Sequence, residues 1–311
     1  MTGNVLVTGG GFIGSQLVKA LVKRGDNVVV YDAFPDLRRL KEVEAKIQIE
    51  RGDLLDLAYL VQTIRSHKIN KIIHTAAVGW RAGSDKQPMR TLQVNVQGSA
   101  NIYEAARLTD VERVVGFCSY WVYGKTVREP VDEDHPLNPR EGVYNVSKLM
   151  AEKWGLMYSN LYDLDFISVR PTSVYGPDQP PGNEPLAMLV NAIAGQPTKW
   201  PNGRDLRFDP ICVFDLVNGV IAALDVNEAK LKHRVFNLGY GKDYTIGQVA
   251  DIIKKLIPGA VIDVGPGLVP EWDCATGTIS IKRAEEELGY KPKYDPEKGF
   301  KLCIEHAKKQ G

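Results

Sequence analysis

The chain has 311 residues, enough for one large domain or for two that share a core. Its 39 lysines and arginines balance 38 aspartates and glutamates, so charge gives no reason to expect nucleic acid or an anionic membrane as a partner. No apolar run approaches the ~20 residues needed to span a bilayer, and no signal peptide is visible. The four cysteines lie far apart without metal-ligand spacing, so we expect a cytoplasmic protein with reduced thiols and no metal.

Short β-branched runs alternate with helical patterns through the first two thirds of the chain. In chain order we expect strands at 5–8, 28–31, 72–75, 114–118 and 166–170, and helices at 13–24, 57–66, 97–107 and 144–161. The strands are apolar throughout, which is typical of a parallel sheet covered on both faces. The sequence therefore predicts an α/β fold with a Rossmann-type, doubly wound parallel sheet.

The pattern changes after Pro171. Helical patterns follow at 186–194, 246–257 and 282–288, while 211–224 and 235–238 look like one more helix and strand of the main sheet. We therefore expect a first domain over 1–171, completed by about 208–240, and a smaller, interleaved C-terminal substrate-binding region over 172–207 plus 241–311.

A glycine motif joins the first strand to the first helix. Gly9, Gly11 and Gly14 form Gly-x-Gly-x-x-Gly. The first glycine allows a tight turn, the second lets the backbone approach a pyrophosphate, and the third lets the helix pack on the strand. The helix N-terminus then faces the anion, so the motif predicts a dinucleotide site.

Carboxylates follow the second and third strands of this pattern. Asp32 can accept hydrogen bonds from both ribose hydroxyls of NAD and would repel the 2′-phosphate of NADP, although Arg38 or Arg39 could bind that phosphate instead. Asp53 and Leu54, after a possible strand at 47–50, could hold the adenine edge or form a plain turn.

A tyrosine and a lysine four residues apart share one helix face. A nearby ammonium, here Lys148, favours the phenolate of Tyr144 and lowers its pKa from about 10. Ser119 follows the strand at 114–118 and so lies at the carboxyl edge of the sheet, where ligands bind in such folds. Together, these groups predict hydride and proton transfer at a carbon that bears a hydroxyl.

With these motifs in order, the chain resembles the extended short-chain dehydrogenase/reductases, in particular the NAD-dependent epimerase/dehydratase family that includes UDP-glucose 4-epimerase. The matching segments are VTGGGFIGS (7–15), GDL (52–54), HTAA (74–77), NVQG (95–98), Ser119 with VYG (122–124), YNVSK (144–148), and RP (170–171) with VYGP (174–177).

The resemblance implies NAD as cofactor and assigns roles to single residues. Tyr144 would be the acid/base, Lys148 would bind the nicotinamide ribose, Ser119 would polarise the substrate oxygen, and Asn95 would support the proton network. The implied cofactor residues are Gly9, Gly11, Phe12, Ile13, Gly14, Asp32, Asp53, Leu54, Thr75, Ala76, Ala77, Asn95, Tyr144, Lys148 and Pro171. The implied substrate residues are Ser119, Tyr120, Ser173 and Arg207. The family usually dimerises through the helices at 97–107 and 144–161, which implies a homodimer.

Four departures from the family pattern bear on the substrate and the loop. The glycine loop is one residue shorter than usual. Ser173 replaces an asparagine and Phe208 replaces an arginine, with Arg207 one position away, and a late arginine has no match within 265–278. A one-residue slip turns a strand side chain to the other face unless a bulge corrects it. Because a diphosphate is typically held by charge-assisted bonds, these losses favour a substrate without one.

The sequence therefore predicts an enzyme that carries out NAD-dependent oxidation or reduction at a secondary alcohol carbon of a sugar, sugar acid or other small polyol. The alternative is a nucleotide-sugar epimerase or dehydratase with an unusual diphosphate clamp using Arg204 or Arg207. A third hypothesis is a non-catalytic dinucleotide sensor, against which the joint presence of Ser119, Tyr144 and Lys148 argues.

Overall fold

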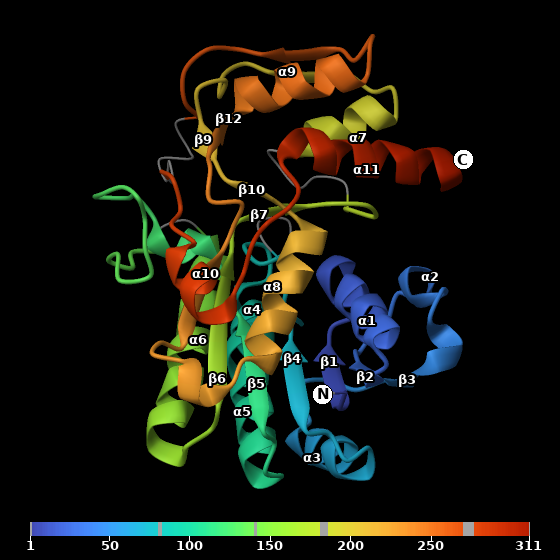
Figure 1. The fold of residues 1–311 in the computed structure, drawn as a ribbon, viewed down its shortest axis with the longest axis vertical. Helices are drawn as coiled ribbons and strands as arrows, with labels where there is room; N and C mark the ends of the chain where they lie inside the picture. Colours follow the sequence, from blue (N-terminus) through green and yellow to red (C-terminus); the bar gives the residue numbers. More distant parts are fainter. Residues whose placement is uncertain (1, 80–82, 140–141, 181–185, 270–276, 311) are drawn as a thin grey trace. The chain divides into compact units, whose positions relative to one another are not determined.

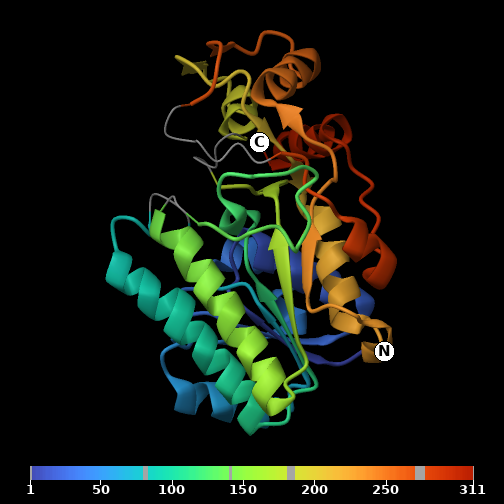
Figure 2. The same ribbon diagram turned by 90° about the vertical axis from the view of Figure 1, so that its left-hand side faces the viewer.

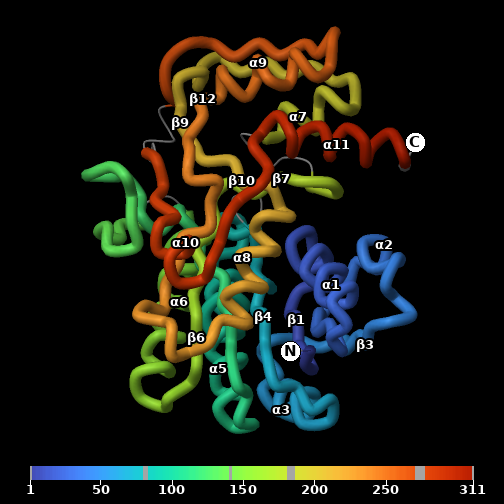
Figure 3. The backbone as a smooth tube through the Cα atoms, viewed as in Figure 1, coloured from blue at the N-terminus to red at the C-terminus, as the bar shows by residue number. Residues whose placement is uncertain are grey.

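The chain forms two compact units, each assembled from separated stretches of sequence. The computed structural model describes residues 2–79, 83–139, 142–180, 186–269 and 277–310. The first unit comprises residues 1–122, 139–170 and 217–236, and the second comprises 123–138, 171–216 and 237–311. The backbone tube in Figure 3 lets each stretch be followed by its colour. The domain boundaries expected from the sequence stay a prediction.

A seven-stranded sheet dominates the first unit. Its strand order is β11-β6-β5-β4-β1-β2-β3, and the neighbouring pairs from β3 to β6 are parallel (Figure 1). An order of 3-2-1-4-5-6 is that of the doubly wound dinucleotide-binding sheet. The predicted fold class is therefore confirmed.

The sheet alternates with helices along the chain. Its strands are β1 (Asn4–Thr8), β2 (Asn27–Tyr31), β3 (Ile47–Glu50), β4 (Lys71–His74), β5 (Arg113–Phe117), β6 (Phe166–Pro171) and β11 (Val235–Leu238). The helices that join them are α1 (Phe12–Arg24), α2 (Leu37–Leu40), α3 (Leu57–Ser66), α4 (Pro88–Thr91), α5 (Gly98–Leu108), α6 (Gly142–Tyr162) and α8 (Val213–Asp225). Short 3-10 turns are η1 (Glu44–Lys46), η3 (Tyr120–Tyr123) and η4 (Glu228–Lys230), and η2 (Leu92–Gln97) is π-helical.

Both faces of this sheet are buried, which is why its strands read as continuous apolar runs. Leu6 and Val29 on one face pack in a cluster with α3 and α5, while Val5 and Val30, which point the other way, are also buried. On one side α5 and α6 run side by side (Figure 2). The helix expected at 97–107 begins one residue later, because η2 precedes it.

The second unit is built from short strands and helices around its own core. Three two-stranded sheets pair β10 (Pro210–Cys212) with β7 (Ser173–Tyr175), β12 (Tyr244–Thr245) with β9 (Arg207–Phe208), and β13 (Ile262–Val264) with β8 (Thr198–Trp200). Its helices are α7 (Ala187–Ile193), α9 (Ile246–Leu256), α10 (Lys282–Leu288) and α11 (Pro296–Gln310). The sequence did not predict α11. In the described ranges of the chain, no helix combines the length and apolar character that crossing a bilayer requires.

Candidate active site

A pocket of about 510 Å³ lies in the first unit, at the carboxyl ends of its strands. Such crevices are where ligands bind in doubly wound sheets. The residues expected to bind the cofactor that line this pocket are Gly9, Gly11, Phe12, Ile13, Gly14, Asp32, Asp53, Leu54, Thr75, Ala76, Ala77 and Tyr144. Further lining residues, which the sequence did not indicate, are Tyr31, Ala33, Phe34, Val78, Gly79, Arg90 and Val94. The fold thus brings residues as far apart in sequence as Gly9 and Tyr144 into the lining of one pocket.

The glycine loop has the clearances that a phosphate-binding turn needs. Gly9 has φ +85°, and a Cβ there would lie 2.9 Å from Cα of Ala76. A Cβ on Gly14 would lie 1.8 Å from the carbonyl oxygen of Gly9, so no side chain fits between helix and strand. A Cβ on Gly11, the N-cap of α1, would meet nothing within 4 Å, and no side chain caps this helix. The N-terminus of α1 is therefore open to an anion.

Asp32 fastens the glycine loop to the end of β2. Its Oδ2 accepts a hydrogen bond from the backbone N–H of Gly10 at 2.7 Å, and Oδ1 accepts one from Phe34 at 2.8 Å. A carboxylate oxygen accepts more than one such bond, so ribose hydroxyls can be added. Arg38 and Arg39 both pair with Asp36, and neither is among the described residues that line the pocket. This geometry suits NAD better than NADP.

Asn95 ties the cofactor wall to α6. Its side-chain Oδ1 accepts from the backbone N–H of Val78 at 2.7 Å, and its Nδ2 donates to the Val78 carbonyl at 3.2 Å and to Ser147 Oγ at 2.9 Å. Asn95 itself is buried and does not line the pocket. It acts on the site by holding other groups in place.

A row of ionisable side chains follows one face of α6 at intervals of four residues. Tyr144 lines the pocket, Lys148 is buried one turn later, and Glu152 is buried after a further turn. Glu152 forms an ion pair with Arg170 of β6 at 2.6 Å and accepts from Ser168 Oγ at 2.7 Å. Glu152 was not predicted as a site residue, although it continues the four-residue spacing of Tyr144 and Lys148 in the sequence.

The electrostatics of this row differ from the expectation that Lys148 lowers the pKa of Tyr144. Desolvation raises the pKa of the Tyr144 phenol, and the neighbouring Cys118 thiol raises it further, although part of the tyrosine remains exposed. Desolvation also lowers the pKa of Lys148 to about 8, against the opposing influence of Cys118 and Glu152. Within the protein alone, burial outweighs the charge of Lys148, so a phenolate needs further positive charge.

Ser119 is the second residue after the end of β5 at Phe117 and is almost fully buried. Its Oγ accepts from the backbone N–H of Trp121 at 3.3 Å. The preceding residue, Cys118, places its Sγ 3.6 Å from the carbonyl oxygen of Lys148, which brings the end of β5 against α6. Tyr120 is buried, with its ring against Trp121. Neither Ser119 nor Lys148 is among the described residues that line the 510 Å³ pocket.

His74 is a core residue of the first unit. Its Nδ1 lies 2.6 Å from Thr8 Oγ1 and its Nε2 lies 2.9 Å from Ser99 Oγ. Burial lowers its pKa to about 3, so the ring is neutral and serves the packing of β1, β4 and α5.

The other expected site residues belong to the second unit and are placed there by its own contacts. Pro171 is buried and Ser173 lies in β7. Arg207 in β9 makes two bonds to the Glu129 carboxylate, both at 3.0 Å, and one to Asp243 at 2.5 Å. Its neighbour Phe208 is buried in the core of this unit.

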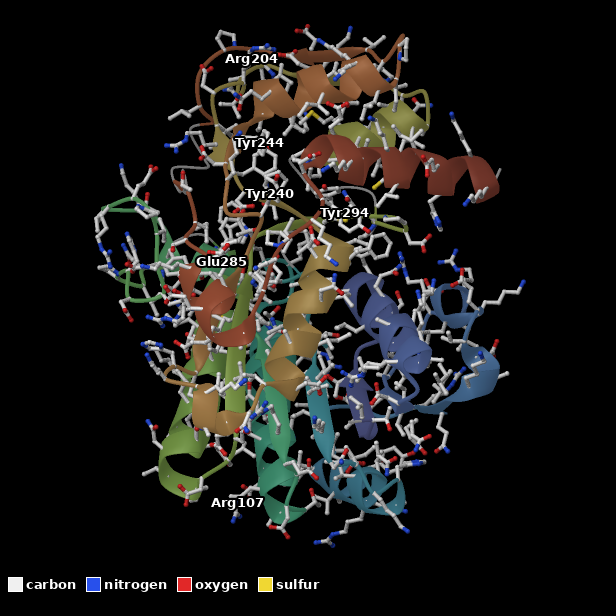
Figure 4. The ribbon with its side chains drawn as sticks, in the orientation of Figure 1. Arg107, Arg204, Tyr240, Tyr244, Glu285 and Tyr294 are labelled. Atoms are coloured by element: carbon white, nitrogen blue, oxygen red, sulfur yellow. The ribbon has the colours of Figure 1, made fainter. Side chains whose placement is uncertain are left out.

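The strand that carries Arg207 is interrupted at Asp209, between β9 and β10. The carboxylate of Asp209 is buried and accepts from the backbone N–H groups of Tyr240 and Gly241, each at 2.8 Å. Figure 4 shows Tyr240 near Tyr244, and places Arg204 beside α9, where it pairs with Asp251 at 3.1 Å. Both arginines that could form a diphosphate clamp are thus paired with carboxylates.

The first unit fits a dinucleotide. Gly11 and the N-terminus of α1 would hold the pyrophosphate, Asp32 a ribose, and Asp53 with Leu54 the adenine end. Lys148 would lie toward the nicotinamide ribose, with Tyr144 at the reacting end of the pocket.

Comparison with known proteins agrees with this geometry. The model of the NAD dependent epimerase/dehydratase family matches residues 5–239. A putative UDP-glucose 4-epimerase of Methanocaldococcus jannaschii is 30% identical over 98% of this chain and 98% of that protein. A UDP-glucose 4-epimerase of Mycolicibacterium smegmatis is 33% identical over 96% of this chain and 97% of that one. The solved structure of MoeE5 with UDP-glucose and NAD has a TM-score of 0.85 at 29% identity and covers 99% of both chains. Since the family match spans the whole cofactor pocket and the residues after it, the chain belongs to the NAD-dependent epimerase/dehydratase family and is an enzyme that uses NAD.

Proposed function

We propose that the protein is a nucleotide-sugar epimerase that inverts a secondary alcohol carbon of a UDP-hexose. The observation that carries the proposal is the position of Tyr144 in the wall of the NAD pocket, on the helix that buries Lys148 one turn later. Relatives described as UDP-glucose 4-epimerases match this chain over almost the full length of both partners, which supports the same reaction here.

The chemistry follows from the groups on α6 and at the end of β5. Bound NAD supplies a reversible acceptor for the hydride on the carbinol carbon. Tyr144 takes the hydroxyl proton as that hydride leaves and returns it when the hydride comes back. The carbon is inverted when the intermediate ketone turns in the site and receives the hydride on its opposite face, and no cofactor is consumed. Ser119 hydrogen-bonds the same oxygen, and Lys148 supplies part of the positive charge that the phenolate needs.

A second candidate is release of the ketone, which makes the enzyme a dehydrogenase on a sugar without a diphosphate. The observation that favours it is the saturation of Arg207 by Glu129 and Asp243. A diphosphate would have to compete with two carboxylates for this guanidinium. The similarity to UDP-glucose 4-epimerases supports the epimerase more strongly than the dehydrogenase, which was favoured by the sequence alone.

The test is to incubate the protein with UDP-galactose and a catalytic amount of NAD, and to follow both the sugar nucleotides and NADH absorbance. We expect conversion to UDP-glucose without net NADH. Tyr144→Phe should lower turnover by about 10²–10⁴ and leave NADH affinity nearly unchanged, because only the proton-transferring hydroxyl is lost. In a second assay with NAD in excess, steady accumulation of NADH with a free sugar, and none with UDP-galactose, would favour the dehydrogenase.

A further inference from the structure

Arg90 is a cation in the wall of the NAD pocket to which neither the motifs nor the family pattern assigns a role. It lies on α4, and Val94, four residues later, lines the same pocket. Thr91, which follows Arg90, and Asn95, which follows Val94, are both buried. Asn95 is bonded to Val78, and Thr91 Oγ1 donates to the Gln87 carbonyl. One side of this helical segment is therefore anchored, and the adjacent side faces the cofactor.

The guanidinium of Arg90 is held at the end of β3. Its Nη2 donates to Oδ2 of Asp53 at 3.2 Å. The other carboxylate oxygen of Asp53 accepts from the backbone N–H of Leu55 at 3.0 Å, and Tyr31 donates its hydroxyl to the Asp53 carbonyl at 3.0 Å. The partner of Arg90 is thus itself fixed, which restricts where the guanidinium can lie.

Hydrogen bonding to Asp53 uses the edge of the guanidinium and leaves its planar faces for another contact. Arg90 keeps 40% of its side chain exposed, so the pair is not sealed into the core. A guanidinium plane stacks well on aromatic rings, whereas an ammonium does not offer such a face. The end of the pocket with Asp53 and Leu54 is where the adenine is expected.

We propose that Arg90 binds NAD by stacking its guanidinium, oriented by Asp53, on the adenine ring. Among the described residues that line this pocket, Arg90 is the one lysine or arginine. Its charge also offsets the carboxylates of Asp32 and Asp53 beside a cofactor that carries a pyrophosphate. The proposal concerns the cofactor and is independent of the sugar substrate.

The test separates the adenosine half of the cofactor from the nicotinamide half. Dissociation constants for NADH and for reduced nicotinamide mononucleotide, which lacks adenosine, are measured by nicotinamide fluorescence with the full-length protein. The dissociation constant of the mononucleotide divided by that of NADH reports the contribution of the adenosine monophosphate half. In Arg90→Ala we expect this ratio to fall by about 5- to 30-fold, the range for a stacked guanidinium, with the mononucleotide constant unchanged.

Two further variants decide how Arg90 acts. Arg90→Lys keeps the positive charge but lacks the planar guanidinium, so the ratio of dissociation constants should fall nearly as far as in Arg90→Ala. Arg38→Ala, which breaks an exposed arginine–aspartate pair outside the pocket lining, should leave the ratio unchanged. An unchanged ratio in Arg90→Ala, equal weakening of both ligands, or full recovery in Arg90→Lys would each overturn the stacking role.

Discussion

Two buried side chains, Lys148 and Asp209, have pKa values moved toward neutrality by desolvation. The pKa of Lys148 falls to about 8 and that of Asp209 rises to about 7. The lowered pKa of Lys148 is part of the proposed mechanism, since its ammonium lies one helical turn from Tyr144, the proposed acid/base. Asp209 has a different task, because its carboxylate holds the backbone of Tyr240 and Gly241 in the second unit.

The Asp209 carboxyl should make stability depend on pH. Its folded-state pKa lies above the ordinary 3.8, so the folded state holds the proton more tightly than the unfolded state. The resulting stabilisation is complete below about pH 4 and is lost as pH rises through about 7. A shift of this size corresponds to about 4 kcal/mol at most.

Comparing the wild type with Asp209→Asn isolates this contribution, because asparagine stays neutral at every pH. Urea unfolding of both proteins from pH 5 to pH 8 should show the wild type losing stability relative to the variant as pH rises. Parallel stability curves for the two proteins would contradict the assignment.

At the scale of elements, α6 has two faces with different tasks. One face carries Tyr144, Lys148 and Glu152, while Val146, Met150 and Trp154, also four residues apart, are 43%, 44% and 46% exposed. An apolar stripe of this kind on a helix surface is typical of a contact with another chain. We propose that it forms part of a homodimer interface, as the family resemblance implied.

Trp154→Glu should therefore produce a monomer, because it places a charge in the middle of the stripe where a partner would have to desolvate it. Sedimentation velocity of the wild type and the variant measures this directly. Val261→Glu, at another exposed apolar residue, is the matched control and should not change the state of association. A monomeric wild type would show that the stripe does not mediate dimerisation.

The sequence predicted those parts of the molecule that depend on local spacing. The glycine turn, the order of the sheet strands and the placement of Tyr144 and Lys148 on one helix face all follow from local patterns of the chain itself. Arg90 could not be found in this way, because it joins the pocket beside Asp53, which follows a strand distant from it in sequence. The raised pKa of Tyr144 was also missed, since desolvation depends on the packing of the whole unit.

The first unit depends on its last stretch of sequence, residues 217–236, which follows part of the second unit along the chain. The backbone N–H of Ser168 donates to the backbone carbonyl of Arg234 at 2.8 Å, where β6 meets β11. The buried guanidinium of Arg113 donates to the carbonyls of Ala223 and Val226. A fragment that stops before these residues leaves an unpaired sheet edge and removes these carbonyl partners of Arg113, which keeps its ion pair with Asp165.

We therefore expect residues 1–178, expressed alone, to lack both cooperative unfolding and NADH binding. Co-expression with residues 179–311 restores the missing strand and should recover NADH binding in the reassembled protein. Circular dichroism and NADH fluorescence are the measurements. A fragment that binds NADH as tightly as the full chain would show that α8 and β11 are dispensable.

The interleaving of the two units also bears on how such an enzyme changes its substrate over evolutionary time. The second unit is encoded by three stretches, residues 123–138, 171–216 and 237–311, separated by parts of the first. A single recombination event cannot replace it as a block. New specificity in this lineage is therefore expected to accumulate by point substitution and short insertion, while the cofactor half is inherited intact.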